Sequence, residues 1–137
     1  MTRRDFQRLA ERRLTDATVL LRNRRYDAAY YLAGYAVECA FKACIAKRMR
    51  RNVFPPKDLQ QNLYIHNLDK LRDLAMLKPI FDKESNTDPV FMVKWGVVKD
   101  WSEDSRYRVI RRTKANEMVA AVADPSCGVL RCIKEHW

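Results

Sequence analysis

Glycine, proline and strand-like patterns are scarce in this chain of 137 residues, which has three glycines and five prolines. Glycine and proline most often interrupt regular structure, and strict alternation of apolar and polar residues is the pattern of a half-buried strand. Their scarcity favours an all-α protein. No internal repeat or low-complexity segment divides the sequence, so its length predicts a single domain over residues 1–137 that buries its own core.

Several chemical signatures are also missing. The sequence has no Gly-rich phosphate loop, no paired-carboxylate site and no nucleophile elbow. Its cysteines form two pairs with four residues between them, Cys39 with Cys44 and Cys127 with Cys132. Residues five apart on a helix point about 140° away from each other, so neither pair can chelate one zinc ion. We therefore expect free thiols, no metal and no cofactor.

The N-terminus, MTRRDFQRLAERR, lacks the apolar segment that forms the centre of a signal peptide, so we expect a cytoplasmic protein. The most apolar stretch, residues 28–46, is close to the length that a bilayer core requires. Glu38 and Lys42 stand in its centre, where isolated charges are costly. The sequence therefore predicts no membrane span.

Acidic residues are too few to balance the basic ones: 17 Asp and Glu stand against 27 Lys and Arg, a formal net charge of +10. The basic residues cluster near positions 3–13, 22–25, 47–51 and 106–114. This excess favours RNA or another phosphate-bearing partner. The alternative is that the clusters are solvated faces or a surface for an acidic protein. A nucleic-acid footprint requires that clusters converge on one surface, which a sequence does not reveal.

The longest apolar stretch, YYLAGYAVECAFKACI from Tyr30 to Ile45, repeats its apolar residues at helical spacing. A helix that is apolar nearly all round is buried on several sides. Glu38 and Lys42 lie four residues apart, so they share a face and can pair. The pair has two interpretations, a structural ion pair inside a helix interface or a direct role in a functional site.

The spacing of apolar residues predicts three helices in the first part of the chain. The first covers about residues 2–23, and a short turn connects it to the second over about residues 27–51, so the two are antiparallel neighbours. The second ends before Pro55, because proline cannot continue a helix. The third begins near Asn67, a good N-cap, and stops at about Pro79.

Two helical regions follow. Asp88 with Pro89 predicts the start of a short helix to Lys99, although residues 91–97 also alternate as a strand would. The last region begins near Thr113 and keeps helical phase through Pro125. This pattern predicts one kinked helix or two nearly coaxial pieces, with Pro125 opening the second.

Three motifs follow one another along the chain. They are Ala36-Val37-Glu38 with Lys42-Ala43, then His66-Asn67-Leu68 with Leu71, then Trp101-Ser102 with Arg106-Tyr107. Together they resemble the HEPN-domain family, from about Leu9 to Val122, whose second helix carries the pattern A-x-E-x-x-x-K-A and whose two further elements follow at these distances. The resemblance implies an up-and-down bundle of four or five helices and a homodimer. It also suggests a minimal nucleotidyltransferase as partner in a two-component, toxin–antitoxin-like system.

Catalytic members of this family are metal-independent ribonucleases that use an R-x4-6-H motif at a dimer interface. Arg131 and His136 fit it as R-x4-H. Histidine can act as general base toward a ribose 2'-hydroxyl, and arginine can stabilise charge on the phosphate. Five apart on a helix, the two do not share a face, so a homodimer would have to bring one copy of each together. Cys132 departs from the family pattern, which usually has Asn, Asp or His directly after the arginine.

The resemblance and the charge also suggest residues for binding a nucleotide or RNA: Glu38, Lys42, His66, Trp101, Arg106, Tyr107 and Arg108. His66 can be a base, or a structural histidine that opens the third helix and bonds a backbone group or a carboxylate. Trp101 and Arg106 can stack on a base or pin the link to the last helix. Two functions stay open: a module that binds a nucleotide or RNA or docks on a nucleotidyltransferase, and an endoribonuclease toxin.

Overall fold

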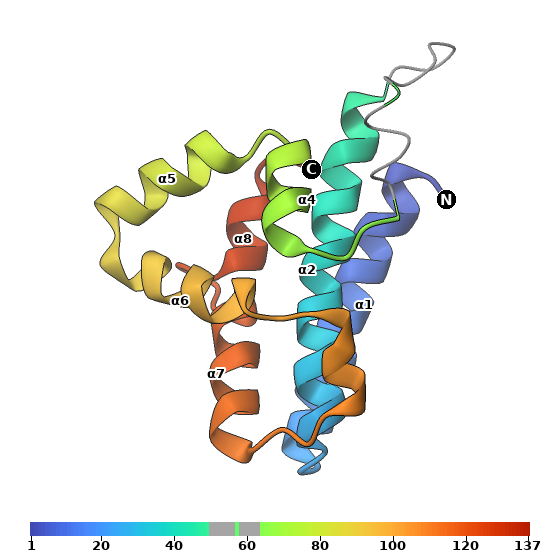
Figure 1. Ribbon diagram of the computed structural model, residues 1–137, viewed down its shortest axis with the longest axis vertical. Helices are drawn as coiled ribbons and strands as arrows, with labels where there is room; N and C mark the ends of the chain where they lie inside the picture. Colours follow the sequence, from blue (N-terminus) through green and yellow to red (C-terminus); the bar gives the residue numbers. More distant parts are fainter. Residues whose placement is uncertain (50–56, 58–63) are drawn as a thin grey trace.

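A computed structural model describes residues 1–49, 57 and 64–137. Throughout these residues the secondary structure is helical, with no strand, so the all-α prediction is confirmed. The predicted end of the second helix at Arg51, before Pro55, lies outside the described residues. The elements are α1 (Arg3–Arg22), α2 (Tyr26–Arg48), α4 (Leu68–Leu74), α5 (Lys78–Thr87), α6 (Pro89–Lys99), the 3-10 helix η1 (Glu103–Tyr107), α7 (Arg112–Ala123) and α8 (Val129–Lys134) (Figure 1).

Helices α1 and α2 form an antiparallel pair. A capping box starts α1: the Thr2 hydroxyl accepts from the Asp5 N–H, and the Asp5 carboxylate accepts from the Thr2 N–H. The Thr2 N–H and the Thr2 hydroxyl both donate to the Asp5 carboxylate, and these two bonds lower the pKa of Asp5. Arg24, with a φ of 60°, ends the helix in the left-handed region, and the Arg25 N–H bonds back to the Leu20 carbonyl. This is a Schellman turn, and it leaves the Arg24 and Arg25 side chains exposed.

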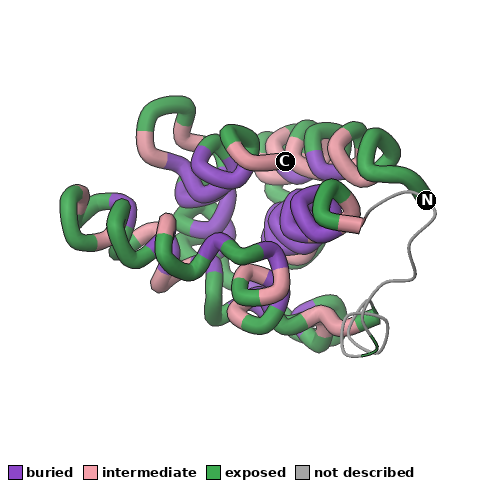
Figure 2. Tube along the Cα trace, turned by 90° about the horizontal axis from the view of Figure 1, so that it is seen from above, coloured by how far each residue is buried: buried purple, intermediate pink, exposed green. Residues whose placement is uncertain are grey.

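Helix α2 is the centre of the molecule. Viewed along the bundle, it appears as a buried coil surrounded by the other helices (Figure 2). Its alanines and Gly34 let neighbouring helices approach closely, while Val37 and Phe41 fill the space between them. Because α1, α4, α7 and α8 all pack against it, nearly every face of α2 is apolar.

Helices α4, α5 and α6 form the side of the bundle. The predicted caps are present: the Asn67 side chain accepts from the Lys70 N–H, and the Asp88 side chain accepts from the Val90 N–H. The segment 91–97 is helical, so the competing strand interpretation is wrong. Helix α5 was not predicted, because we expected helical structure to stop at Pro79. That proline instead occupies the first turn of α5, where a missing N–H costs little.

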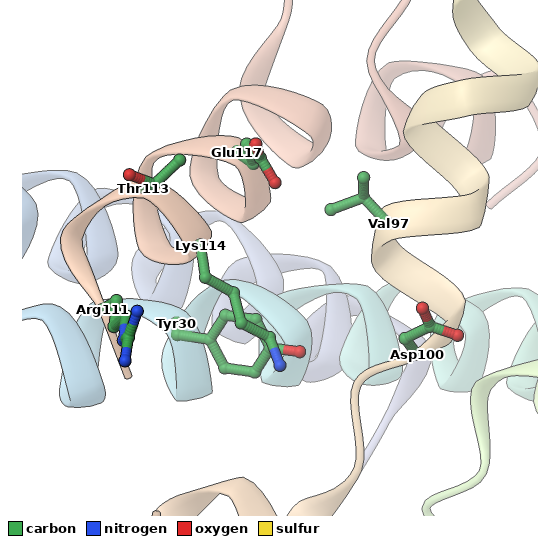
Figure 3. A pocket seen from close by; sticks show the side chains of 7 residues that line it. All are labelled: Tyr30, Val97, Asp100, Arg111, Thr113, Lys114 and Glu117. Carbon is green, nitrogen blue, oxygen red and sulfur yellow. The ribbon is translucent and has the colours of Figure 1, made fainter. Parts of the chain in front are cut away.

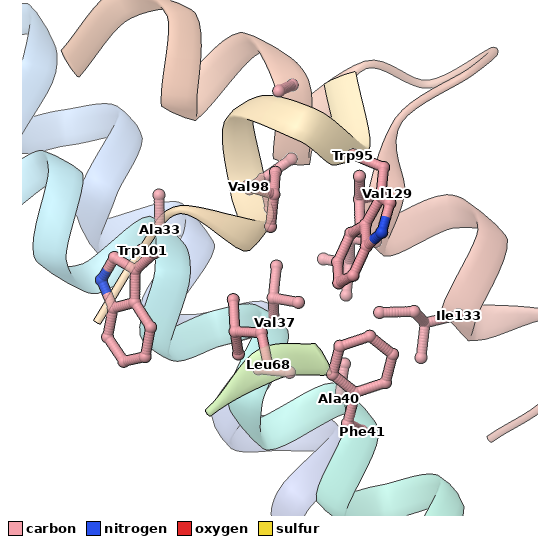
Figure 4. Close-up of a cluster of buried hydrophobic side chains, with 14 of the residues drawn as sticks. Ala33, Val37, Ala40, Phe41, Leu68, Trp95, Val98, Trp101, Val129 and Ile133 are labelled. Atoms are coloured by element: carbon pink, nitrogen blue, oxygen red, sulfur yellow. The ribbon is translucent and has the colours of Figure 1, made fainter. Parts of the chain in front are cut away.

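The core where α2, α4, α6 and α8 meet is shown in Figure 4. Phe41, Phe81, Phe91 and Trp95 form an aromatic cluster in which Phe41 and Phe81 are tilted and the other pairs pack edge to face. The Phe81 and Trp95 centroids lie 4.8 Å apart. Ile133 of α8, fully buried, completes this cluster. The fold therefore depends on apolar contacts between segments that are distant in sequence.

The connection between α7 and α8 corrects one prediction. Pro125 does not open a helix, because α8 begins at Val129, with Gly128 as its N-cap. The Asp124 carboxylate accepts from the N–H groups of Ser126 and Cys127, which fixes a turn over these residues. The region is therefore two separate helices, and Figure 1 draws α8 above α7.

Candidate functional site

A chain of charged side chains connects α2 to η1 through His66. The Lys42 ammonium donates to Glu38 Oε1 at 2.7 Å. His66 Nδ1 lies 3.0 and 3.1 Å from the two Glu38 oxygens, and His66 Nε2 lies 3.1 Å from Glu103 Oε2. The order along this chain is therefore Lys42, Glu38, His66, Glu103, with Glu38 the most deeply buried member.

Burial explains why the inner part of this chain needs its partners. Glu38 is 1% exposed, and a buried carboxylate is tolerated only when it is paired and hydrogen-bonded. Lys42 and His66 supply those contacts. His66 had two interpretations, a base or a structural histidine. The structural interpretation requires a bond to a backbone group or a carboxylate just before α4, and the contact with Glu38 is of that kind. The His66 side chain is 41% exposed, so it also reaches the surface.

Trp101 packs against α2 rather than facing solvent. The indole is 3% exposed, lies over Gly34 and has its ring centroid 5.8 Å from that of Tyr31. Its face is therefore covered in this structure, and it cannot stack on a base without moving. The Trp101 Nε1 and the Ser105 hydroxyl are buried without a hydrogen-bond partner among the described residues.

Arg106, Tyr107 and Arg108 differ from Trp101 because all three are exposed. The Arg106 guanidinium lies 4.9 Å from the centroid of the Tyr107 ring, and Tyr107 is 77% exposed. A cation over an exposed aromatic ring offers one planar surface and one positive charge side by side. Such a pair can contact a base and a phosphate of the same ligand.

One hydrogen bond brings two basic clusters together. The Asp27 carboxylate, in the first turn of α2, accepts from the Ile110 N–H at 2.5 Å. The turn between α1 and α2 and the link before α7 therefore lie at the same end of the molecule (Figure 1). We call this surface the basic end; its exposed cations are Arg24, Arg25, Arg106, Arg108, Arg111, Arg112 and Lys114. Within the described part of the chain, none of them forms a salt bridge.

A hollow of about 340 Å³ adjoins the basic end, between α2, α6 and the start of α7 (Figure 3). Arg111 and Lys114 line it, and the Lys114 ammonium lies 5.3 Å from the centroid of the Tyr30 ring. Burial raises the pKa of Tyr30, so its hydroxyl stays protonated. Asp100 and Glu117 line the same hollow, so its charge is mixed, unlike that of the open basic surface.

Arg131 and His136 lie toward the other end of the bundle. The Arg131 guanidinium donates to the Ser126 carbonyl at 2.9 Å and lies 3.6 Å from Glu135. His136 follows the end of α8, and its carbonyl accepts from Lys47. No hydrogen bond joins the Arg131 and His136 side chains within the residues described. The structure therefore separates this pair from the basic end and does not bring its two members together within one chain.

Comparison with known proteins identifies the family. The family model of the HEPN domain matches residues 4–82. The chain belongs to the HEPN-domain family. The match includes Glu38, Lys42 and His66 and ends before α6, so η1, α7 and α8 lie outside it. Comparisons with curated proteins and with solved structures found no match.

Two contributors to this HEPN protein's surface were missed from sequence. Glu103 lies between the Trp101 and Arg106 motifs but belongs to neither, and only the fold places it beside His66. Asp27 resembles any acidic residue in the first turn of a helix, and nothing in the sequence indicates its bond to Ile110. In the described residues, no group of three or more potential ligands gathers for a metal, and no helix is long and apolar enough to cross a membrane.

Proposed function

We propose that this HEPN-domain protein binds single-stranded RNA at the basic end. The observation that carries the proposal is the meeting of two unpaired basic clusters at one end of the bundle, beside an exposed tyrosine. Basic clusters that converge on one surface are the electrostatic footprint of a nucleic-acid site. Cations already paired with carboxylates contribute less, because a phosphate would have to displace their partners.

The chemistry of the surface favours an unpaired strand. Tyr107 presents a ring on which a base can stack, and the arginines around it can each contact phosphates in bidentate geometry. A duplex hides the faces of its bases, so an exposed aromatic ring contributes little to its binding. The proposed activity of this surface is therefore binding.

The test compares two double variants with the same change in charge. Arg108→Glu with Arg111→Glu alters the basic end, and Arg4→Glu with Arg8→Glu alters exposed positions near the start of α1, at the other end of that helix. Fluorescence anisotropy with labelled single-stranded RNA should give at least a ten-fold loss of affinity for the first variant. The dependence of binding on salt should also become shallower, because fewer counterions are released. Equal losses in both variants would overturn the proposal.

Tyr107→Ala tests the stacking contribution separately. Base–aromatic stacking contributes about 1–3 kcal/mol per base, so affinity should fall by roughly 5- to 150-fold without a change in salt dependence. Val93→Ala serves as control for RNA affinity, because Val93 is also an exposed apolar residue but belongs to α6, outside the proposed contact surface. Unchanged affinity in Tyr107→Ala would remove the ring from the proposed contact surface.

The second candidate function is the metal-independent endoribonuclease that uses Arg131 and His136. The observation in its favour is that Arg131 is exposed on α8 and the half-buried His136 follows the end of that helix, where the same residues of a second copy could approach them. Purified protein would be incubated with labelled RNA in the presence of a chelator. Cleavage to 2',3'-cyclic phosphate ends that is lost in Arg131→Ala and in His136→Ala supports this function; its absence in the wild type excludes it.

The homodimer and the minimal nucleotidyltransferase partner complete the proposal. A stable interface buries more than roughly 1,000 Å² in total, so a dimer of that kind persists at tens of micromolar. Light scattering that gives the mass of one chain at this concentration would refute the dimer. Co-purification with a nucleotidyltransferase encoded by a neighbouring gene would support the two-component system.

A further inference from the structure

A second hollow, of about 390 Å³, lies where η1 meets the start of α4. It is distinct from the basic end, although η1 connects the two: Glu103 and Asp104 begin this 3-10 helix, and Arg106 and Tyr107 end it. At a rise of about 2.0 Å per residue, the two surfaces are separated by roughly 10 Å along η1. A strand bound at the basic end can therefore extend into this hollow.

The hollow contains a carboxylate that is held in place. Glu103 Oε2 lies 3.1 Å from His66 Nε2, and the other ring nitrogen of His66 lies 3.0 Å from the buried Glu38. Among the described residues, the second oxygen of Glu103 has no hydrogen-bond partner, so it stays available to a ligand. A fixed acceptor binds a ligand with little loss of side-chain entropy.

Hydrogen-bond donors line the same hollow. The Asn67 side-chain oxygen is used as the N-cap of α4, which leaves the Asn67 NH₂ group to donate outward. Lys70, one turn further, is exposed and has no salt-bridge partner within the described residues. Asp104, exposed beside Glu103, supplies a second carboxylate. Acceptors and donors thus line one hollow that is large enough for a purine base.

We propose that this hollow is a guanine-binding site. Where the guanine is a base within RNA, this inference rests on the function proposed above. Guanine presents two adjacent donors, N1–H and the N2 amino group, next to two acceptors, O6 and N7. The Glu103 and Asp104 carboxylates accept from the donors. Lys70 and Asn67 donate to the acceptors. Adenine and cytosine each offer only one amino group, and uracil offers a single N–H between two carbonyls.

Stacking is available at the rim. Tyr64 is 84% exposed and lines the hollow, so its ring can cover one face of a bound base. The buried Trp101 also lines the hollow. Hydrogen bonds on the base edge and a stacked face together give the selectivity that single-stranded RNA-binding sites use.

The experiment titrates the full-length protein with GMP, IMP, AMP, CMP and UMP by calorimetry or by NMR. We expect GMP to bind at least ten-fold more tightly than AMP, CMP and UMP. IMP, which lacks the N2 amino group, should fall between them. Glu103→Gln should abolish the preference, and Lys70→Gln should weaken GMP binding. Glu84→Gln on α5 is the matched control and should leave binding unchanged, with circular dichroism used to verify folding of each variant.

Equal affinity for all five nucleotides, or none for any, would overturn the inference, as would a GMP preference that survives Glu103→Gln. The Arg108→Glu/Arg111→Glu variant separates this site from the basic end. It should lose affinity for RNA and keep its preference for free GMP. A wild-type protein that prefers GMP but does not bind RNA would refute the proposed function alone, whereas RNA binding at the basic end without base preference would refute only the guanine site.

Discussion

The two helix-interior glycines of this protein allow a matched test of how α2 packs. Gly34, in α2, faces Trp101: a Cβ added there would lie under 3.0 Å from three atoms of the indole ring. Gly96, in α6, has no other atom within 4 Å of the place where its Cβ would be. Alanine raises helix propensity equally at both positions, by about 1 kcal/mol relative to glycine. The two substitutions therefore differ only in what the methyl group meets.

The expected magnitudes follow from that difference. Gly96→Ala should stabilise the protein by about 0.5–1 kcal/mol, because the helix gains and nothing is displaced. In Gly34→Ala the same gain is opposed by overpacking, which typically costs about 1–3 kcal/mol. The backbone N–H of Trp101 donates to the Val98 carbonyl, which fixes the main chain at this residue, so the indole ring cannot move away freely. We expect a net loss of roughly 1–2 kcal/mol, and therefore a gap of about 2–3 kcal/mol between the variants.

Urea denaturation, followed by circular dichroism at 222 nm as a probe of helix, measures both free energies of unfolding. Tryptophan fluorescence provides a second signal, because a displaced indole changes its surroundings. If Gly34→Ala is as stable as Gly96→Ala and leaves the fluorescence unchanged, Trp101 does not pack on α2 as described. The covered position of Trp101 in the candidate site would then also be wrong.

Three further predictions concern charge and thiols. Glu38→Ala should destabilise the protein by roughly 3–5 kcal/mol in urea titration, because it leaves the half-buried Lys42 ammonium without its partner. A loss below about 1 kcal/mol would contradict the buried ion pair. Hydrogen bonds from Lys94 and from the turn after Asp124 hold the pKa of Asp124 far below its usual value. The stabilising contribution of Asp124 is therefore fully present above the unfolded pKa of about 3.9 and is lost as the pH falls through the folded pKa. Asp124→Asn should therefore be less stable than the wild type at pH 7, and the difference in urea midpoint should shrink in acid; a constant difference would argue against this. Burial raises the pKa of the Cys39 and Cys132 thiols to about 12 and that of Cys44 to about 11. A thiol reagent should therefore modify only the half-buried Cys127 in the native protein and all four cysteines after unfolding. Rapid modification of a second thiol in the native state would count against the packing of α2 and α8.

The helix boundaries were predictable where local chemistry determines them. Asn67 and Asp88 cap α4 and α6 as their side chains predicted. Helix α5 was missed because its segment, KPIFDKESNT, contains only two large apolar residues, too few to establish a period. Pro125 was misplaced because apolar residues keep the same phase on both sides of it. The Asp124 carboxylate, not helix geometry, shapes the chain between them.

The candidate site divides in the same way. The pairing of Glu38 with Lys42 follows from their spacing of four residues on one helix. The contacts of His66 with Glu38 and with Glu103 join residues that are 28 and 37 positions apart, and no periodic pattern encodes such contacts. The meeting of the two basic clusters likewise depends on how α2 and the link before α7 pack.

The burial of α2 on every side has a consequence for how the protein can be divided. The family match stops at residue 82, yet Phe41 packs on Trp95 of α6, and Cys44 contacts the Ile133 carbonyl of α8. A fragment cut at that boundary would expose the apolar face of α2 to water, and we expect it to aggregate rather than fold. The boundary that sequence similarity marks is therefore not a boundary of cooperative folding. Fragments for expression, and fusions at the end of the matched segment, should retain α7 and α8.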